Sequence, residues 1–259
     1  MTVQVHPTAI IGNNVEIASN TVIGPHCIIE DDVKIGEGNI FMASIYIGRY
    51  TVIGDGNHFF PFSTIGVVPQ DLKFKDEPTR LEIGNDNMIR EHVTLHRGTG
   101  HGGGLSKIGS NNLIMVGGHV AHDCFVGNHA IISHGAALAG HVIVGDHATV
   151  GASSSVHQFC RVGDYAFIGG HSVVTQDAIP FVKTVGNRAK IYGINTIGLE
   201  RKGFPKEEIN NLRSAYRILF QKKMRLAEAL EKLDSDYGEC ARVNFMTQFI
   251  KTAERGIVR

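Results

Sequence analysis

The 259-residue sequence has no apolar run that approaches the length of a membrane span, and its start, MTVQVHPTAI, lacks the basic and then apolar segments of a secretion signal. We therefore expect a cytoplasmic protein with no integral membrane segment. Cysteine is also scarce: Cys27, Cys124, Cys160 and Cys240 have no paired spacing and form no C-x-x-C motif. The sequence therefore favours free thiols in a reducing compartment over disulfides or a cysteine metal site.

Basic residues are the minority of the charged residues in the N-terminal part of the chain and acidic residues are the minority in the C-terminal part, although the formal net charge is zero. Residues 1–182 hold nine Lys and Arg against sixteen Asp and Glu, a balance of −7, and residues 183–259 hold sixteen against nine, a balance of +7. The C-terminal excess offers a positive surface to an acidic protein partner. A merely solvated helix face is the alternative, and we expect no nucleic-acid partner.

An aliphatic residue recurs at every sixth position in the middle of the chain. This period is neither the 3.6 of a helix nor the 2 of a lone strand, so it predicts a coil of short strands joined by turns. Three such hexads make a triangular turn of eighteen residues, and successive turns stack at the strand spacing of about 4.8 Å. The aliphatic residues are Ile108, Ile114, Val120, Val126, Ile132, Leu138, Val144, Val150, Val156, Val162, Ile168 and Val174.

Polar residues that accept a positive φ follow each aliphatic residue, as in Gly127-Asn128-His129. The sequence therefore predicts a mainly β protein, with a parallel β-helix over residues 1–190. Helical spacing of apolar residues after Pro205 predicts an α-helical domain over residues 191–259, which can cap the open end of the coil. Two stretches, 66–82 and 96–107, interrupt the repeat and are expected to form loops, where function concentrates.

Most of the fourteen histidines fall at turn positions and are expected to be structural. Positions about eighteen residues apart should lie above one another on one edge of the coil. This groups His122, His141 and the pair His157-Gln158, while His119 should face outward on the same turn as His122.

His122 is followed directly by Asp123. A neutral histidine beside a carboxylate has the composition of a general base, because the carboxylate fixes the tautomer and stabilises the imidazolium that forms on proton abstraction. Adjacency in sequence leaves open whether the two side chains touch.

Segments spread from residue 6 to residue 204 give the chain a resemblance to a known family. They are HPTAIIG, QDLKF, EPTR, LHRGT, GGGLSKIGSNNLIM, HVAHDCFVGN, LAGHV, VHQFCRVG and ERKGF. In this order they resemble the acyl-carrier-protein:UDP-N-acetylglucosamine O-acyltransferases, hexapeptide-repeat enzymes that begin lipid A synthesis. The resemblance implies a left-handed coil and transfer of a (3R)-3-hydroxyacyl chain from acyl carrier protein to the sugar 3-hydroxyl of UDP-N-acetylglucosamine.

The resemblance also implies roles for individual residues. His122 would be the general base, Asp123 would orient it, and the Gly140 backbone N–H would stabilise the oxyanion. Contacts to the sugar, phosphates and nucleotide are implied for Gln70, Asp71, Leu72, Lys73, His119, His141, His157, Gln158, Asn195, Arg201 and Lys202.

Two positions depart from the family pattern: Ile197 stands where an acidic residue is usual, and Lys202 replaces an arginine, which keeps the charge but loses bidentate geometry. Gly170 matches the position that sets acyl length. Because glycine leaves a groove open there, we expect a long acyl chain, with a plain corner glycine as the alternative.

No cofactor is expected, because the thioester on the carrier's phosphopantetheine is already activated. Arg201, Lys202 and the positive C-terminal part would receive the acidic acyl carrier protein. The resemblance further implies a homotrimer with sites between subunits.

Three alternatives have different requirements. A zinc carbonic anhydrase on the same coil would use three histidines from stacked turns and a neighbouring subunit, for which His119, His122 and His157 are candidates. A coenzyme A-dependent acetyltransferase would differ in its acyl donor. A scaffold or ice-binding solenoid would need flat, Thr-rich faces, which are absent.

Overall fold

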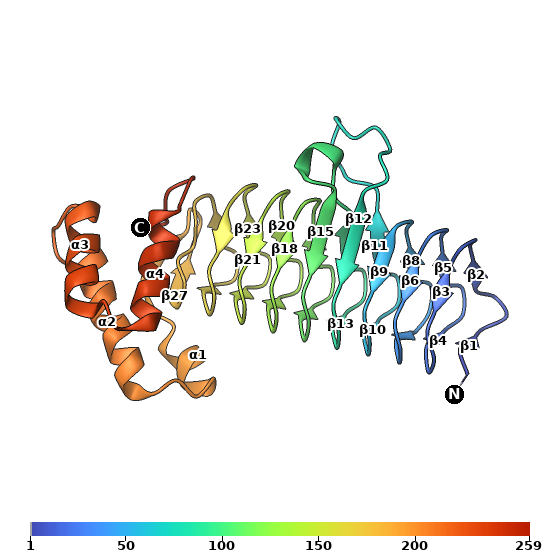
Figure 1. Cartoon of the computed structure of the whole chain (residues 1–259), viewed down its shortest axis with the longest axis horizontal. Helices are drawn as coiled ribbons and strands as arrows, with labels where there is room; N and C mark the ends of the chain where they lie inside the picture. The colour runs from blue at the N-terminus through green and yellow to red at the C-terminus, as the bar shows by residue number, and fades with distance from the viewer. Residues whose placement is uncertain (1) are drawn as a thin grey trace.

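The computed structural model describes residues 2–259 and has the form of a slender column with a group of helices at the end opposite the N-terminus (Figure 1). The column is a left-handed parallel β-helix. Its three faces are three sheets that are parallel except at one antiparallel edge strand, and within the coil a strand pairs with the strand one turn earlier and one turn later in the chain. The predicted coil is confirmed.

The sheets are named A, B and C in the order in which the chain enters them. Sheet A contains β1 (Gln4–Val5), β4 (Val22–Ile23), β7 (Ile40–Phe41), β10 (His58–Phe59), β13 (Met88–Ile89), β16 (Leu113–Ile114), β19 (Ile131–Ile132), β22 (Thr149–Val150), β25 (Phe167–Ile168), β27 (Val182–Val185) and β28 (Lys190–Ile194). Sheet B contains β2 (Ile10–Ile11), β5 (Ile28–Ile29), β8 (Tyr46–Ile47), β11 (Thr64–Val67), β14 (Thr94–His96), β17 (His119–Val120), β20 (Ala137–Leu138), β23 (Ser155–Val156) and β26 (Val173–Val174). Sheet C contains β3 (Glu16–Ile17), β6 (Lys34–Ile35), β9 (Thr51–Ile53), β12 (Arg80–Ile83), β15 (Leu105–Ile108), β18 (Phe125–Val126), β21 (Ile143–Val144) and β24 (Arg161–Val162).

The core is built from the six-residue repeat, because the aliphatic residue of each hexad points inward. In sheet A, Ile131 pairs with Thr149 and Thr149 with Phe167, so equivalent residues are eighteen apart. The neighbours of these residues, Ile132 and Val150, are fully buried in consecutive layers. Fully burying such a side chain contributes roughly 1.5–3 kcal/mol, so the stacked column supplies the main stabilisation of the coil.

The corners explain the many histidines. His129, His141 and His147 have φ angles of 56°, 62° and 57°, in the left-handed region that Asn, Asp and His enter more readily than most side chains. His26 and His171 also have positive φ. The structural interpretation of the corner histidines is therefore confirmed for their backbones, although His141 has a further role in the site described below.

The two interruptions of the repeat form loops that project from one edge of the column, near β12 and β15 (Figure 1). The first loop, residues 68–79, joins β11 to β12, and the second, residues 97–104, joins β14 to β15 and contains the single 3₁₀ turn η1 (Gly100–Gly102). Both are shorter than the predicted segments 66–82 and 96–107, because the strands extend into each predicted loop.

The C-terminal helices are α1 (Thr196–Arg201), α2 (Lys206–Phe220), α3 (Leu226–Tyr237) and α4 (Ala241–Lys251). Pro205, predicted to lie in the first turn of a helix, is the N-cap of α2 and immediately precedes that turn. The strand β28 pairs antiparallel with β27 and leads into α1. The predicted boundary between the coil and the helical domain, at residue 190, therefore falls at the first residue of an edge strand, and this division of the chain stays a prediction.

An ion pair fastens the helices to the end of the coil. The Arg161 Nε atom lies 2.7 Å from Oδ2 of Asp177, a residue that is 1% exposed. The same guanidinium donates to the Phe249 carbonyl oxygen and to Thr252 Oγ1 at the end of α4. The backbone N–H of Val258 donates to the Asp177 carbonyl oxygen, so the tail closes against the last turn.

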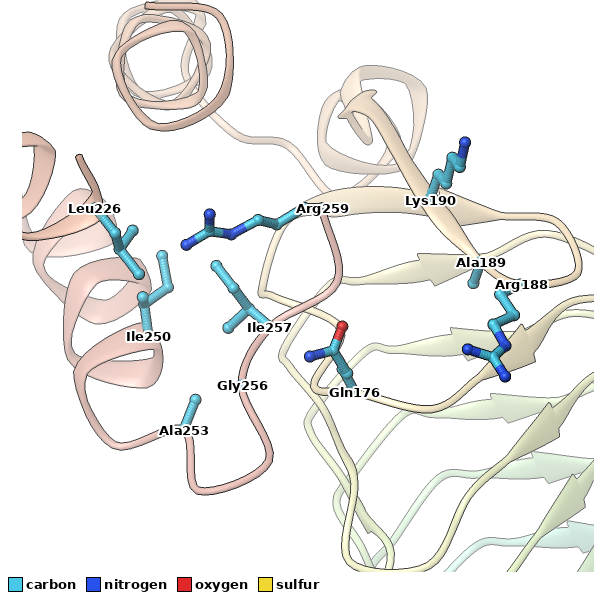
Figure 2. Close-up of a pocket in the computed structure, with 10 residues that line it drawn as sticks. All are labelled: Gln176, Arg188, Ala189, Lys190, Leu226, Ile250, Ala253, Gly256, Ile257 and Arg259. Carbon is cyan, nitrogen blue, oxygen red and sulfur yellow. The ribbon is translucent and has the colours of Figure 1, made fainter. Parts of the chain in front are cut away.

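A cavity of about 440 Å³ lies at this junction, between the last turn of the coil and α4 (Figure 2). Its cationic side chains do not converge, since Lys190 and Arg188 point away from each other in Figure 2. It therefore lacks a set of polar groups that could orient one ligand. Within residues 2–259, no helix combines the length and the apolar character needed to cross a membrane.

Candidate active site

The edge between sheets B and C carries a contact between His122 and Asp123. The two residues form the corner between β17 and β18, and Asp123 has a φ of 58°. His122 Nδ1 lies 2.8 Å from Asp123 Oδ2, and the exposed fractions of the two side chains are 14% and 0%. This contact leaves Nε2 as the free nitrogen of the ring, which is the arrangement of an oriented general base.

The second loop and the strand β15 that follows it supply the groups that hold Asp123. The Thr99 backbone N–H donates to Asp123 Oδ1 over 2.8 Å, and the Thr99 hydroxyl donates to Oδ2 over 2.7 Å. The Asp123 N–H donates to the Ser106 hydroxyl oxygen. Gly102 packs so closely on the carboxylate that a Cβ there would overlap it. The sequence analysis missed Thr99 and Ser106, and the only available signal was the predicted loop 96–107, which contains both residues.

Gly140 lies one turn above His122. A Cβ on Gly140 would lie 2.6 Å from His122 Cε1 and 2.8 Å from Nε2, so only glycine allows the imidazole to sit there. Its neighbours Ala139 and His141 donate their N–H groups to backbone carbonyls, whereas the Gly140 N–H has no acceptor among residues 2–259. A free N–H beside the free nitrogen of His122 suits an oxyanion donor.

His141 closes the side of the site facing the C-terminal end. Its ring centroid lies 5.4 Å from that of His122, with the rings at 90°, and its Nε2 lies 3.6 Å from Asp123 Oδ2. The ring stacks on Phe159, with centroids 4.3 Å apart. Burial is the main cause that lowers the pKa of His141, so the neutral ring is favoured.

His119 and His96 line the side facing the N-terminal end. His119 Nδ1 lies 2.6 Å from the Thr94 hydroxyl, and its ring meets that of His96 edge-on at 5.0 Å. Burial lowers the pKa of His96 to about 4 and also lowers the pKa of His119, with the neighbouring His122 as a smaller cause in both cases. Two neutral rings therefore stand beside the proposed base.

The predicted grouping of these residues on one edge is confirmed, and the structure adds their register. Residues eighteen apart are those in register, so His122 aligns with Gly140 and Gln158, and Asp123 aligns with His141 and Phe159. His141 follows His122 by nineteen residues, and His157 follows His141 by sixteen. The three histidines therefore lie on the same edge but at three successive positions of the turn. His157 and Gln158 are exposed, and His157 Nδ1 is 3.1 Å from the Gln158 carbonyl oxygen.

The first loop brings Asp71 to the site. Asp71 Oδ1 accepts from the Lys73 N–H over 2.8 Å, and Oδ2 lies 3.2 Å from His101 Nε2. The Lys73 N–H, His101 and His122 together lower the pKa of Asp71, which favours the carboxylate. Gln70, Leu72 and Lys73 are exposed on the same loop. His101 is a third residue that the sequence analysis missed.

The residues predicted to bind the nucleotide lie on another part of the column. Asn195, Arg201 and Lys202 line a cavity of about 540 Å³ over sheet A and the corner between sheets C and A, together with Ile197 and His147. Asn195 also caps α1, accepting from the Gly198 N–H and donating to the Tyr165 carbonyl oxygen. One chain therefore does not bring these residues to His122.

Gly170 lies at the corner between sheets A and B. It is exposed, and a Cβ there would meet only the backbone of Ala152, with the carbonyl oxygen at 3.3 Å. A side chain at this position would therefore project into open space. The same chain does not bring Gly170 to His122, which lies on a different corner.

One group of potential metal donors occurs among residues 2–259. Donor atoms of His122, Asp123 and His141 lie within 4.8 Å of one another. Asp123 Oδ2 already accepts from the Thr99 hydroxyl and lies against His122 Nδ1. His119 and His157, which the zinc alternative requires, are not part of this group.

Comparisons with known proteins support one family. Residues 141–176 match the bacterial transferase hexapeptide family, and residues 177–258 match domain 2 of UDP-N-acetylglucosamine O-acyltransferase. The chain is 48% identical over 256 residues to the acyl-[acyl-carrier-protein]--UDP-N-acetylglucosamine O-acyltransferase of Thermodesulfovibrio yellowstonii, covering 99% of both chains.

Solved structures show the same similarity. LpxA from Acinetobacter baumannii superposes with a TM-score of 0.96 at 44% identity, over 98% of this chain and 99% of that chain. The UDP-N-acetylglucosamine O-acyltransferase of Moraxella catarrhalis has the same TM-score at 40% identity, over the full length of both chains.

Proposed function

The chain belongs to the UDP-N-acetylglucosamine O-acyltransferase family, and we propose that its histidine site transfers a (3R)-3-hydroxyacyl chain from acyl carrier protein to the 3-hydroxyl of UDP-N-acetylglucosamine. This is the first step of lipid A biosynthesis. The observation that carries the proposal is the placement of His122, whose Nδ1 lies against buried Asp123 and whose Nε2 edge faces Gly140.

The reaction needs one base and one oxyanion donor. His122 Nε2 takes the proton from the sugar 3-hydroxyl as its oxygen forms a bond to the thioester carbonyl carbon. The carbonyl electron pair moves onto oxygen, and the Gly140 N–H stabilises the resulting charge. When the intermediate collapses, the C–S bond breaks and the His122 imidazolium returns the proton to the phosphopantetheine sulfur. Asp123 keeps the base in one tautomer throughout.

The remaining predicted residues would bind the two substrates. Gln70, Asp71, Leu72 and Lys73 line the sugar, with His119, His141, His157 and Gln158 completing the sugar and phosphate contacts. Asn195, Arg201 and Lys202 bind the nucleotide, and Ile197 gives that subsite an apolar wall. The reaction requires no cofactor, because the thioester supplies the activated acyl group.

A homotrimer is part of the proposal. Support comes from the placement of His122 and Arg201 on different corners of one column, so that a single chain cannot present both to one small substrate. In a cyclic trimer each chain offers one corner to the next copy, which pairs the His122 corner with the Arg201 corner of a neighbour. Acyl carrier protein, an acidic partner, would dock against Arg201, Lys202 and the positive C-terminal domain, in the cytoplasm.

Gly170 is proposed to set the acyl length. Because glycine leaves the corner open, the groove should accept a long chain. The variant Gly170→Met should shift the preference toward shorter acyl chains in an assay with acyl carrier proteins loaded with different lengths. Unchanged length selectivity would refute the assignment.

The variant His122→Ala tests the mechanism, with 3-O-acylation of UDP-N-acetylglucosamine as the readout. Turnover should fall by about 10²–10⁴-fold, the usual contribution of a positioned base. His26→Asn is a matched control, because His26 is also a corner histidine with positive φ and lies near the N-terminus. Retained turnover in His122→Ala would overturn the mechanism, and acetyl-coenzyme A replacing the carrier thioester as donor would favour the acetyltransferase alternative.

A further inference from the structure

His101 connects the two loops at the proposed active site. It lies in η1 of the second loop, and its Nε2 contacts Asp71 Oδ2 of the first loop at 3.2 Å. The exposed fractions of the two side chains are 40% and 18%, so the contact is partly shielded from water. We propose that His101 is a positioning residue that fixes Asp71 for binding of the sugar nucleotide.

Both carboxylate oxygens of Asp71 are engaged in different ways. Oδ1 accepts from the Lys73 N–H, which shapes the first loop from within. Oδ2 is held only from the other loop, by His101. Loss of the His101 contact would therefore leave the Asp71 carboxylate held through Oδ1 alone, with its own turn intact.

The surroundings of His101 favour this role. Glu77 of the first loop lies close to η1, since a Cβ on Gly100 would be 3.0 Å from Glu77 Oε1, and His101 helps lower the pKa of Glu77 after two backbone hydrogen bonds. On the opposite side, the His101 ring centroid is 6.5 Å from that of His141. His101 therefore lies between two acidic residues of the sugar loop and a histidine of the proposed site.

The short turn that carries His101 also holds the proposed catalytic pair. Thr99 is the N-cap of η1 and binds both oxygens of Asp123. One turn thus contacts Asp71 through His101 and Asp123 through Thr99. One short turn thereby contacts both the sugar-binding carboxylate and the carboxylate that orients the base.

The inference rests on the proposed function, because the assay measures acylation of UDP-N-acetylglucosamine. His101→Ala should raise the KM for UDP-N-acetylglucosamine roughly tenfold, because Asp71 would lose its contact with the second loop, with kcat nearly unchanged. His101→Gln keeps an N–H donor of similar reach and should restore most of the affinity. The KM for the acyl carrier protein thioester should not change in either variant.

A double-mutant cycle separates positioning from a general structural effect. If His101 acts through Asp71, then His101→Ala should have no further effect on KM in an Asp71→Ala background. Additive effects, or an unchanged KM in His101→Ala, would overturn the inference. Failure of the proposed function is distinguishable, because the wild-type enzyme would then not acylate UDP-N-acetylglucosamine at all.

Discussion

Replacing Thr99 by valine removes one hydrogen bond from a fully buried carboxylate while preserving shape. The Thr99 hydroxyl lies 2.7 Å from Asp123 Oδ2, the same oxygen that contacts His122 Nδ1. The backbone N–H of residue 99 still donates to Oδ1 in the variant, so Asp123 keeps part of its support. A hydrogen bond to a charged group contributes about 1.5–3 kcal/mol, and we expect the free energy of unfolding to fall by that amount.

The same change should lower kcat about tenfold, because a less tightly held Asp123 orients His122 less well and each 1.36 kcal/mol of barrier is a factor of ten. The KM for UDP-N-acetylglucosamine should change little, since Thr99 contacts Asp123 and not the proposed sugar subsite. Steady-state acylation kinetics and denaturant unfolding measure the two effects.

Thr79→Val is the matched control, because Thr79 is also buried but its hydroxyl has no hydrogen-bond partner among residues 2–259. That variant should be neutral or slightly stabilising. If both Thr99→Val and Thr79→Val have the kcat of the wild-type enzyme, the claim that the second loop orients the catalytic pair is wrong.

Three further predictions concern other parts of the molecule. Gly140→Ala should abolish most acylation while thermal unfolding shows a folded protein, because the added Cβ would lie 2.6 Å from His122 Cε1; activity near the wild-type level would contradict this. Arg161→Met should destabilise the protein by about 3–5 kcal/mol in denaturant unfolding, because Asp177 would remain buried without its partner; a change below 1 kcal/mol would argue against the anchor. The free energy of unfolding should rise with pH between about 4 and 6.5, because the lowered pKa values of His96 and His119 mean that the folded state binds fewer protons than the unfolded chain in this range. His96→Gln should reduce this pH dependence, which unfolding midpoints measured across the same range would show.

The coil could be predicted from the sequence because its cause is local and repeated. Each hexad carries its own aliphatic residue and its own turn residues, so positions such as Ile132 and His129 can be read without knowledge of the rest of the chain. The edge that holds His122 also follows from the period of eighteen. The pair His122-Asp123 was accordingly singled out from the sequence, whereas the role of Gly140 came from the family resemblance.

The groups that orient these residues could not be predicted in the same way. Thr99 and His101 lie where the repeat is lost, and their side chains meet Asp123 and Asp71 only because two irregular loops pack together. Spacing placed His141 and His157 on the edge of His122, but each lies one residue away from the position directly above it, which Gly140 and Gln158 occupy. Loop conformation depends on contacts between distant segments, which periodicity does not contain.

The measurement that tests the central claim most directly is complementation between two inactive variants. His122→Ala and Arg201→Ala, carried on differently tagged chains, are co-expressed and the mixed oligomers are purified through both tags. If each site joins the His122 corner of one chain to the Arg201 corner of a neighbour, every mixed trimer contains one intact site out of three, and about a third of wild-type acylation should return. Mixed oligomers as inactive as the separate variants would contradict the account.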